Sequence, residues 1–333
     1  MPAVTDASIR AVEPAHVLPG GRLWIRGERL PPPDGPGGIT VGGQPARISF
    51  AATDRVAVVV PDGLPGGRTE VRAEWAPGAT LLADVGAAAA TGLHIVDSPV
   101  VTADGSIYAT YSGGRGQEAP VSVFRITPKD TREPFVLGLV NATSLAPGPD
   151  GRLYVSSRFD GSVSRIEPDG HPEKVASDLG QATGLAFGPD GHLFVGDRTG
   201  TIYRLDLAGK PEKFVSLPPS VAAYHLAMGP DEALYVAAPT LSSVDRLLRI
   251  TMDGTVEPFG EPFGRPQGLA FDPTGRLHVV EALAGITGIY RLRPDGTREL
   301  VVSGPRLIGL AFAPDGRMVV ATADTVYRCG AAR

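Results

Sequence analysis

Two arginines of this chain have the type and spacing needed to bind an anion. Arg158 and Arg198 each stand seven residues after the glycine of a tight turn, in two consecutive segments of similar sequence. A guanidinium binds a carboxylate or phosphate through two parallel N–H bonds. We expect both arginines to bind one anion, with Asp197 beside them in the ligand site. The alternative is that they are surface residues paired with Asp160 and Asp197.

A histidine and a glutamate add candidate acid–base groups. His225 occupies a position at which two other segments have glycine, Gly184 and Gly268. An imidazole there is a candidate general base or ligand donor, and the alternative is a buried histidine with a structural role. Glu281 ends an apolar run and is a candidate to accept a proton or to balance an arginine. We therefore predict His225 and Glu281 as catalytic residues.

Further polar residues complete the predicted ligand site. Asn141, Arg265 and Gln267 stand where the segments differ most from one another, which is expected of a binding site rather than of a structural repeat. Asp97 is the best candidate metal ligand. Calcium needs about six to eight oxygen ligands, and the single cysteine, Cys329, excludes a cysteine metal site. We expect no metal and no cofactor, with bound calcium as the alternative.

The elements that position these residues follow from an internal repeat. A tight turn between two apolar runs occurs six times, at spacings of 46, 40, 41, 43 and 41 residues, and an arginine closes a later strand in each copy. This period is typical of a four-stranded propeller blade. The turns are Asp104-Gly105, Asp150-Gly151, Asp190-Gly191, Asp231-Glu232, Thr274-Gly275 and Asp315-Gly316, and the arginines are Arg125, Arg165, Arg204, Arg249, Arg291 and Arg328.

The repeat predicts a closed six-bladed propeller over residues 86–333. The turns mark one face, so the candidate residues, which lie at the opposite ends of the strands, should gather at the mouth of the central channel. The last repeat ends before its fourth strand. We expect residues 80–85 to supply that strand and remove two open edges, which would place the N-terminal domain against the sixth blade.

Residues 1–85 lack the repeat and predict a separate domain. Short alternating strands are separated there by Gly/Pro clusters, which favours a sandwich. The segments Pro-Ala-His-Val-Leu-Pro-Gly-Gly-Arg-Leu-Trp-Ile-Arg-Gly (14–27), Val-Gly-Gly-Gln-Pro-Ala (41–46) and Val-Pro-Asp-Gly-Leu-Pro-Gly-Gly (60–67) resemble an IPT/TIG domain. This resemblance implies an immunoglobulin-like sandwich that serves as an interaction or spacer module.

From residue 86 the chain resembles NHL and gluconolactonase/senescence-marker propellers, as in Gly-Leu-Ala-Phe-Gly-Pro-Asp-Gly-His-Leu-Phe-Val (184–195). The enzymes of this class hold a divalent cation through glutamate and Asn/Asp ligands. Their Glu-Gly-Pro corresponds here to Asp97-Ser98-Pro99, and their Pro-Asn-Gly to Pro266-Gln267-Gly268. Thr143, Thr183, Tyr224 and Ile308 stand where further ligands would be needed, which departs from the metal-dependent pattern.

Composition excludes some classes of partner. The net charge is −5 and there is no run of Lys or Arg, so a nucleic-acid partner is not expected. No stretch approaches about 18 consecutive apolar residues, and residues 1–8 lack the pattern of a signal peptide. We expect a cytoplasmic protein without membrane partners, although secretion is not excluded.

Three functions fit these residues. The first is a site for a small anionic or carboxylate-bearing molecule at the channel mouth, with gluconolactonase-like hydrolysis as its catalytic form. The second is a non-catalytic scaffold that binds a protein partner through the IPT/TIG domain. The third is an enzyme similar to streptogramin lyases, which also pair a channel histidine with a glutamate.

Overall fold

The computed structural model describes residues 7–30, 38–206, 208–283, 287–293 and 295–331. All regular elements in these ranges are β-strands. None of the described residues belongs to a helix with the length and apolarity needed to cross a bilayer. The all-β prediction is therefore confirmed for the part of the chain that the structure describes.

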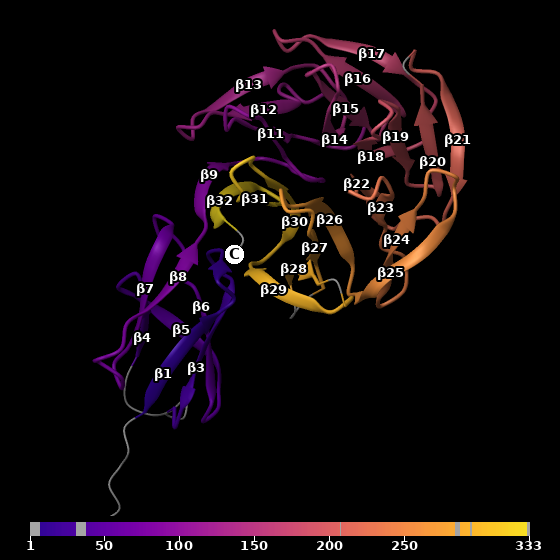
Figure 1. Ribbon diagram of the computed structural model, residues 1–333. Helices are drawn as coiled ribbons and strands as arrows, with labels where there is room; N and C mark the ends of the chain where they lie inside the picture. Colours follow the sequence, from indigo (N-terminus) through magenta and orange to yellow (C-terminus); the bar gives the residue numbers. More distant parts are fainter. Residues whose placement is uncertain (1–6, 31–37, 207, 284–286, 294, 332–333) are drawn as a thin grey trace, which may run out of the picture.

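A ring of short antiparallel sheets makes up most of the molecule (Figure 1). Five sheets of the described chain have four strands each and stand separately. They are β10 (Val100–Val101), β11 (Ile107–Thr110), β12 (Val123–Ile126) and β13 (Arg132–Val136); β14 (Ala142–Pro147), β15 (Leu153–Ser157), β16 (Ser162–Ile166) and β17 (Pro172–Ala176); β18 (Ala182–Phe187), β19 (Leu193–Asp197), β20 (Thr201–Leu205) and β21 (Pro211–Ser216); β22 (His225–Met228), β23 (Leu234–Ala237), β24 (Asp245–Ile250) and β25 (Val256–Phe263); and β30 (Leu307–Phe312), β31 (Arg317–Thr322), β32 (Thr325–Ala331) and β9 (Ala87–Thr91).

Four further strands form the same meander without being a separate sheet. They are β26 (Pro266–Phe271), β27 (Leu277–Glu281), β28 (Gly288–Leu292) and β29 (Arg298–Ser303). The short strand β2 (His16–Val17) pairs in parallel with β29 and with β8 (Leu81–Val85). The meander therefore continues into the N-terminal strands as one sheet of twelve strands. Five sheets therefore stand separately where six blades were predicted, because β2 joins the fifth meander to the N-terminal strands. The N-terminal strands contact the last repeat as well, since β8 lies against β32 and Leu18 packs with Met318 and Val320.

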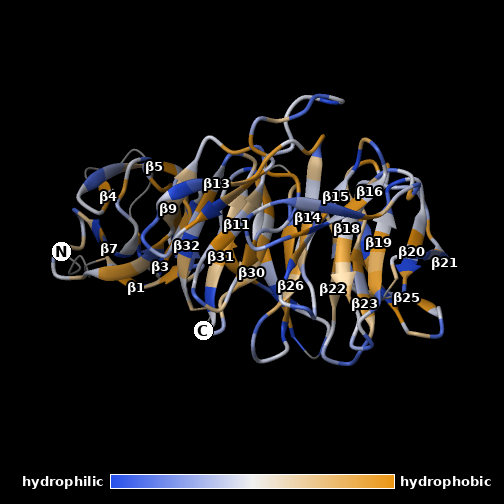
Figure 2. Cartoon of the chain, turned by 90° about the horizontal axis from the view of Figure 1, so that it is seen from above, coloured by the Kyte–Doolittle hydropathy of each residue, from blue (hydrophilic) through white to orange (hydrophobic). Residues whose placement is uncertain are grey.

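The propeller arrangement is clear from the inner strands. β10, β14, β18, β22, β26 and β30 contact one another in this order, and β30 contacts β10. Apolar side chains fill the space between neighbouring sheets, as Phe194, Ile202, Leu226 and Val236 do between the β18–β21 and β22–β25 sheets. Figure 2 shows the hydrophobic residues concentrated on the strands and hydrophilic loops at both of their ends. Burial between the sheets is what a single blade cannot achieve alone.

The N-terminal strands lie beside the ring (Figure 1). Their hydrogen-bonded order is β1 (Ser8–Glu13), β3 (Arg22–Glu28), β6 (Arg55–Val59), β5 (Gln44–Ala51), β4 (Ile39–Val41), β7 (Gly67–Ala73) and β8. Leu23, Ile25, Val58 and Val71 are fully buried in a core that these strands share. Alternating residues of β3 and β7 point into this core, whereas three consecutive residues of β6 are buried.

The strand that closes the ring differs from the predicted one. Residues 80–85 pair with β7 and β2 instead of with the last repeat. β9 pairs antiparallel with β32 and supplies the missing strand. The chain changes sheets at Gly86, where an added Cβ would lie 2.5 Å from Leu18 Cδ2. Both segments are short and apolar, so alternation alone did not identify the sheet to which each belongs.

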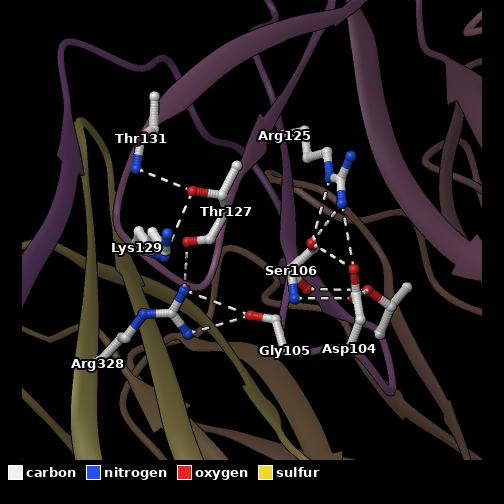
Figure 3. A network of polar contacts seen from close by, with 9 residues as sticks. Asp104, Gly105, Ser106, Arg125, Thr127, Lys129, Thr131 and Arg328 are labelled. Atoms are coloured by element: carbon white, nitrogen blue, oxygen red, sulfur yellow. Dashed lines mark hydrogen bonds and ion pairs between the residues drawn. The ribbon is translucent and has the colours of Figure 1, made fainter.

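Several of the recurring arginines bind the turn of their own repeat, as Figure 3 shows for Arg125. Arg125 donates to Asp104 Oδ2 at 3.2 Å and to the Ser106 hydroxyl, and Arg204 and Arg249 bind Asp190 and Asp231 in the same way. This pairing explains why the two sequence markers keep the same phase.

Arg165 and Arg291 pair with Glu173 and Glu299 on the neighbouring strand, whereas Arg328 reaches into the next sheet. It donates to the carbonyls of Gly105 at 3.3 Å and Thr127 at 2.9 Å and pairs with Asp130 at 2.7 Å. These contacts join the last repeat to the first (Figure 3).

We predict that Arg328→Ala lowers the free energy of unfolding by about 1–2 kcal/mol, because two carbonyls and Asp130 lose a charged donor. Arg317→Ala is the matched control, since the Arg317 side chain is 64% exposed and pairs with Asp315 of its own turn. This variant should change stability by less than about 0.5 kcal/mol. Urea denaturation measures both. Equal effects of the two variants would contradict a role of Arg328 in ring closure.

Candidate functional site

The propeller has a depression at the end of its channel opposite the Asp-Gly turns. This inner hollow has a volume of about 460 Å³ and is lined by residues from every sheet of the ring. Its lining contains Ile95, Val96, Thr143, Arg158, Gln181, Thr183, Arg198, Val221, Ala222, Ala223, Arg265, Gln267, Ala282, Arg306, Leu307, Ile308 and Ala323. The predicted residues Arg158, Arg198, Arg265 and Gln267 therefore meet around one cavity.

A second cavity, the outer hollow, adjoins the first. Its volume is about 720 Å³, and it shares Arg158, Gln181 and Arg198 with the inner hollow. Arg115, Asn141, Phe159, Thr199, Pro219 and Ser220 complete its lining. No Asp or Glu among the described residues lines either hollow. The two hollows thus form a cationic mouth whose centre is the pair Arg158 and Arg198.

Arg158 is half-buried and forms no hydrogen bond or ion pair within the described part of the chain. Asp160, its expected alternative partner, pairs with Lys174 at 3.1 Å instead. Burial lowers the pKa of Arg158, and the charges of Arg198 and Arg115 lower it further. Because arginine stays protonated in proteins, this direction indicates positive charge that nothing nearby balances.

Arg198 is held in place by backbone carbonyls. Its Nε donates to Ser220 O at 3.1 Å and its Nη2 to Val221 O at 2.9 Å. Asp197 does not pair with it, because the Asp197 carboxylate accepts hydrogen bonds from the backbone N–H groups of Gln181 at 2.9 Å and Thr199 at 3.0 Å. The prediction that Asp197 lies in the ligand site is therefore not supported, since its oxygens fix the loops around it.

Arg265 and Arg306 enter the inner hollow from matching loops, one before β26 and one before β30. Both have left-handed backbones, with φ of 56° and 52°. Such a conformation costs a non-glycine residue on the order of 1 kcal/mol and is concentrated at functional sites. Arg306 pairs with Asp324 at 3.0 Å, whereas no ion pair to Arg265 occurs in the described residues. Asn141 has the same backbone conformation at the equivalent position, with φ of 47°, so the conformation belongs to the repeated loop. The two arginines themselves add positive charge to the mouth.

Below the inner hollow, three buried polar side chains bridge three sheets. His225 Nδ1 lies 2.6 Å from Asp97 Oδ1, and His225 Nε2 lies 3.2 Å from Gln267 Oε1. The three residues are at most 6% exposed. Asp97 Oδ1 also accepts the backbone N–H of Ser98 at 2.7 Å. Both ring nitrogens of His225 are thus engaged, and Gln267 separates the imidazole from the hollow.

Two other predicted site residues support loops. Glu281 is fully buried, accepts the N–H of Gly264 at 2.5 Å and pairs with Arg298 at 3.2 Å. Asn141 accepts the N–H of Gly116 at 2.8 Å and donates to Ser112 O and Gly114 O. Both side chains therefore hold backbone groups of their loops. Glu281 is not among the described residues that line either hollow, whereas Asn141 lines the outer one. Their roles in catalysis and ligand binding stay predictions.

The sequence analysis did not identify several residues of the mouth, among them Arg115, Phe159, Gln181 and Arg306. Arg306 could have been found, because it stands two residues before Ile308 as Arg265 stands two residues before Gln267. Arg115 and Phe159 lie on loops without a repeated pattern. Within the described ranges, no group of three or more His, Cys, Asp and Glu side chains is arranged to hold a metal ion.

We predict that Glu281→Ala lowers the free energy of unfolding by about 3 kcal/mol, since it leaves Arg298 and a buried N–H without their acceptor. Glu261→Ala is the control, because Glu261 faces the same arginine at 3.7 Å but is 53% exposed, so its loss should cost less than about 1 kcal/mol. Thermal and urea denaturation report both values. A Glu281→Ala protein of native stability would contradict this structural role.

Solved structures with a similar fold cover nearly the whole chain. An auxiliary nutrient binding protein from Bacteroides ovatus is 10% identical, with 98% of each chain covered and a TM-score of 0.57. The inactive H270A virginiamycin B lyase from Staphylococcus aureus, solved with quinupristin, is 16% identical with 98% and 96% covered and a TM-score of 0.53. A putative gluconolactonase is 19% identical, with 74% of this chain and 91% of that chain covered and a TM-score of 0.58. At these identities the likeness shows the fold alone.

No curated protein matches the chain. The model of the virginiamycin B lyase family matches residues 100–306, a span that contains the candidate arginines, His225 and Gln267. Because this span is more than half of the sequence, the chain belongs to the virginiamycin B lyase family.

Proposed function

We propose that the protein binds a small organic anion at the mouth of its propeller, with Arg158 and Arg198 as the charged donors. The observation that carries this proposal is the half-buried Arg158, which has no partner in the described chain and lies beside two further arginines. A charge removed from water without a counter-charge is costly. A carboxylate-bearing ligand would supply the missing charge and accept two parallel hydrogen bonds.

The arrangement of Arg198 favours the same ligand. Its bonds to two carbonyls hold the guanidinium in one orientation before any ligand arrives. A preorganised donor loses less conformational entropy on binding than a free side chain. Arg265 adds a third charge that pairs with no described residue at the rim. We therefore assign Arg158, Arg198 and Arg265 to ligand binding, and Gln267 to the floor of the site.

The residues present do not fit a divalent cation. Asp97 Oδ1 and Gln267 Oε1, the two candidate oxygens, face the two nitrogens of His225. No further carboxylate joins them among the described residues, whereas calcium needs about six to eight oxygens. We therefore propose no metal-dependent lactonase reaction for this chain.

A lyase reaction is the second candidate, and the buried His225–Asp97 pair favours it. An aspartate on Nδ1 orients an imidazole so that Nε2 can accept a proton. The H270A variant of the S. aureus lyase is described as catalytically inactive, so a histidine matters in that relative. In this chain His225 would reach a ligand only after the Gln267 side chain turned away.

Incubation of the protein with quinupristin distinguishes a lyase reaction from binding without cleavage. The lyase candidate predicts cleavage detected by mass spectrometry, loss of cleavage in His225→Ala, and retained binding of the uncleaved molecule. Absence of cleavage by the unaltered protein would remove the candidate and leave the anion site untouched.

We also propose that residues 1–85 form an immunoglobulin-like module of the IPT/TIG type that docks a protein partner or acts as a spacer, followed by the propeller from residue 86. The shared core of its strands supports an independent unit. The pairing of β2 with β29 would hold this module at a fixed position on the propeller.

We predict that Arg158→Ala weakens binding of small carboxylates about 10- to 100-fold, the range for a lost hydrogen bond to a charged group, and does not lower the melting temperature. Stability should hold or rise because the variant removes charge repulsion with Arg198 and Arg115. Arg152→Ala is the control, since Arg152 pairs with Asp150 and Glu167 at the turn face. Isothermal titration and thermal unfolding measure both properties. Unchanged affinity in Arg158→Ala would refute the proposed site.

A further inference from the structure

The inner hollow combines charge with an apolar floor. Between its arginines, the lining includes Val96 from the β9–β10 connection, Val221 and Ala223 from the β21–β22 connection, and Ile308 from the start of β30. Val221 is 36% exposed. Removing apolar side chains from contact with water lowers the free energy, so the apolar part of a ligand would displace water from this floor favourably.

The uncharged polar side chains of this hollow are mostly engaged within the protein. The Thr143 hydroxyl donates to Asn141 O at 2.8 Å, and the Thr183 hydroxyl donates to Gly196 O at 3.0 Å. Gln267 Oε1 faces His225. Among the uncharged lining side chains, the exposed Gln181 amide and the Gln267 amide nitrogen remain for a ligand, which is few for the several hydroxyls of a sugar acid or sugar phosphate. The charged donors and the apolar floor are the main features that a ligand would meet.

The outer hollow differs from the inner one in its lining. Apart from Phe159 and Pro219, the residues around its arginines are polar, with Asn141, Thr199 and Ser220 among them. Because Arg158 and Arg198 line both hollows, an anion bound to them lies at the junction. The apolar part of a ligand bound through that anion would therefore contact more apolar side chains in the inner hollow than in the outer one.

Exposed apolar side chains also surround the mouth. Leu241 is 95% exposed on the β23–β24 connection, and Leu283 is 40% exposed on the β27–β28 connection. Arg158 and Arg198 lie on the equivalent connections of two other sheets, so all four residues belong to the same face. Apolar groups beside a cationic mouth match a ligand with both characters.

We infer that the ligand is an amphipathic organic acid, whose carboxylate lies between Arg158 and Arg198 and whose aliphatic body fills the inner hollow. This inference rests on the anion site proposed above and adds the class of molecule. The inner volume of about 460 Å³ lies within the range of roughly 300–1,000 Å³ that is usual for sites of small organic ligands.

A chain-length series tests the inference with the full protein. Acetate, butanoate, hexanoate and octanoate are titrated calorimetrically, with octanol and octylammonium as uncharged and cationic counterparts. Burial of one methylene corresponds to an affinity gain of roughly three- to fourfold. We expect octanoate to bind at least tenfold more tightly than acetate, and octanol and octylammonium to bind at least tenfold more weakly than octanoate.

Two variants distinguish the contribution of the arginine to ligand affinity from that of the apolar floor. Arg158→Ala should weaken all four acids by a similar factor. Ile308→Thr keeps the branched shape but adds a hydroxyl, so it should reduce the gain from acetate to octanoate and leave acetate binding unchanged. A circular dichroism spectrum and melting curve confirm that each variant folds.

The outcomes distinguish this inference from the proposed function. If every acid binds through Arg158 but affinity does not rise with chain length, the inference of an amphipathic ligand is overturned and the proposed anion site is retained. Octanoate binding that ignores Arg158→Ala, or binding only to anionic vesicles of phosphatidylglycerol, would overturn the inference as well. Failure of any acid to bind in an Arg158-dependent way would reject both.

Discussion

Closure of the propeller ring is the constraint on which the rest of the structure depends. Each four-stranded sheet buries its faces only against its neighbours, so an open ring would leave two apolar faces in water. The chain closes the ring by pairing β9 with β32 and by placing Arg328 on the first repeat. The side chains of the channel mouth come from different sheets, and closure alone brings them to one cavity.

The mouth places arginines together that repel one another. The closed ring holds them there, with Arg198 fixed by two carbonyls and Arg265 and Arg306 in left-handed backbones. Strain and repulsion that a scaffold tolerates at one place are a common mark of a functional site. The polar bridge of Asp97, His225 and Gln267 lies beneath and links three of the sheets. A ligand with a negative charge would relieve the repulsion, which connects stability with binding.

Much of the fold could be predicted from the sequence, because the turns and the strand arginines recur in phase, and arginines such as Arg125 and Arg204 bind the turn of their own repeat. The closing strand could not be predicted, since residues 80–85 and 87–91 are both short and apolar and their pairing depends on distant partners. At the mouth, Arg158 and Arg198 could be predicted from position. The contacts of Glu281 and Asn141 with backbone groups could not be predicted, because a side chain that caps buried backbone groups and one that binds a ligand have the same polarity in sequence.

The central claim is that Arg158 and Arg198 share one external anion. The most direct measurement is a crystal structure of the protein with a bromine-labelled aliphatic carboxylate, located by anomalous scattering. We predict the carboxylate against both guanidiniums and the bromine over Ile308. A structure in which Arg158 pairs with a carboxylate of the protein itself, or in which the ligand lies outside the mouth, would contradict the account.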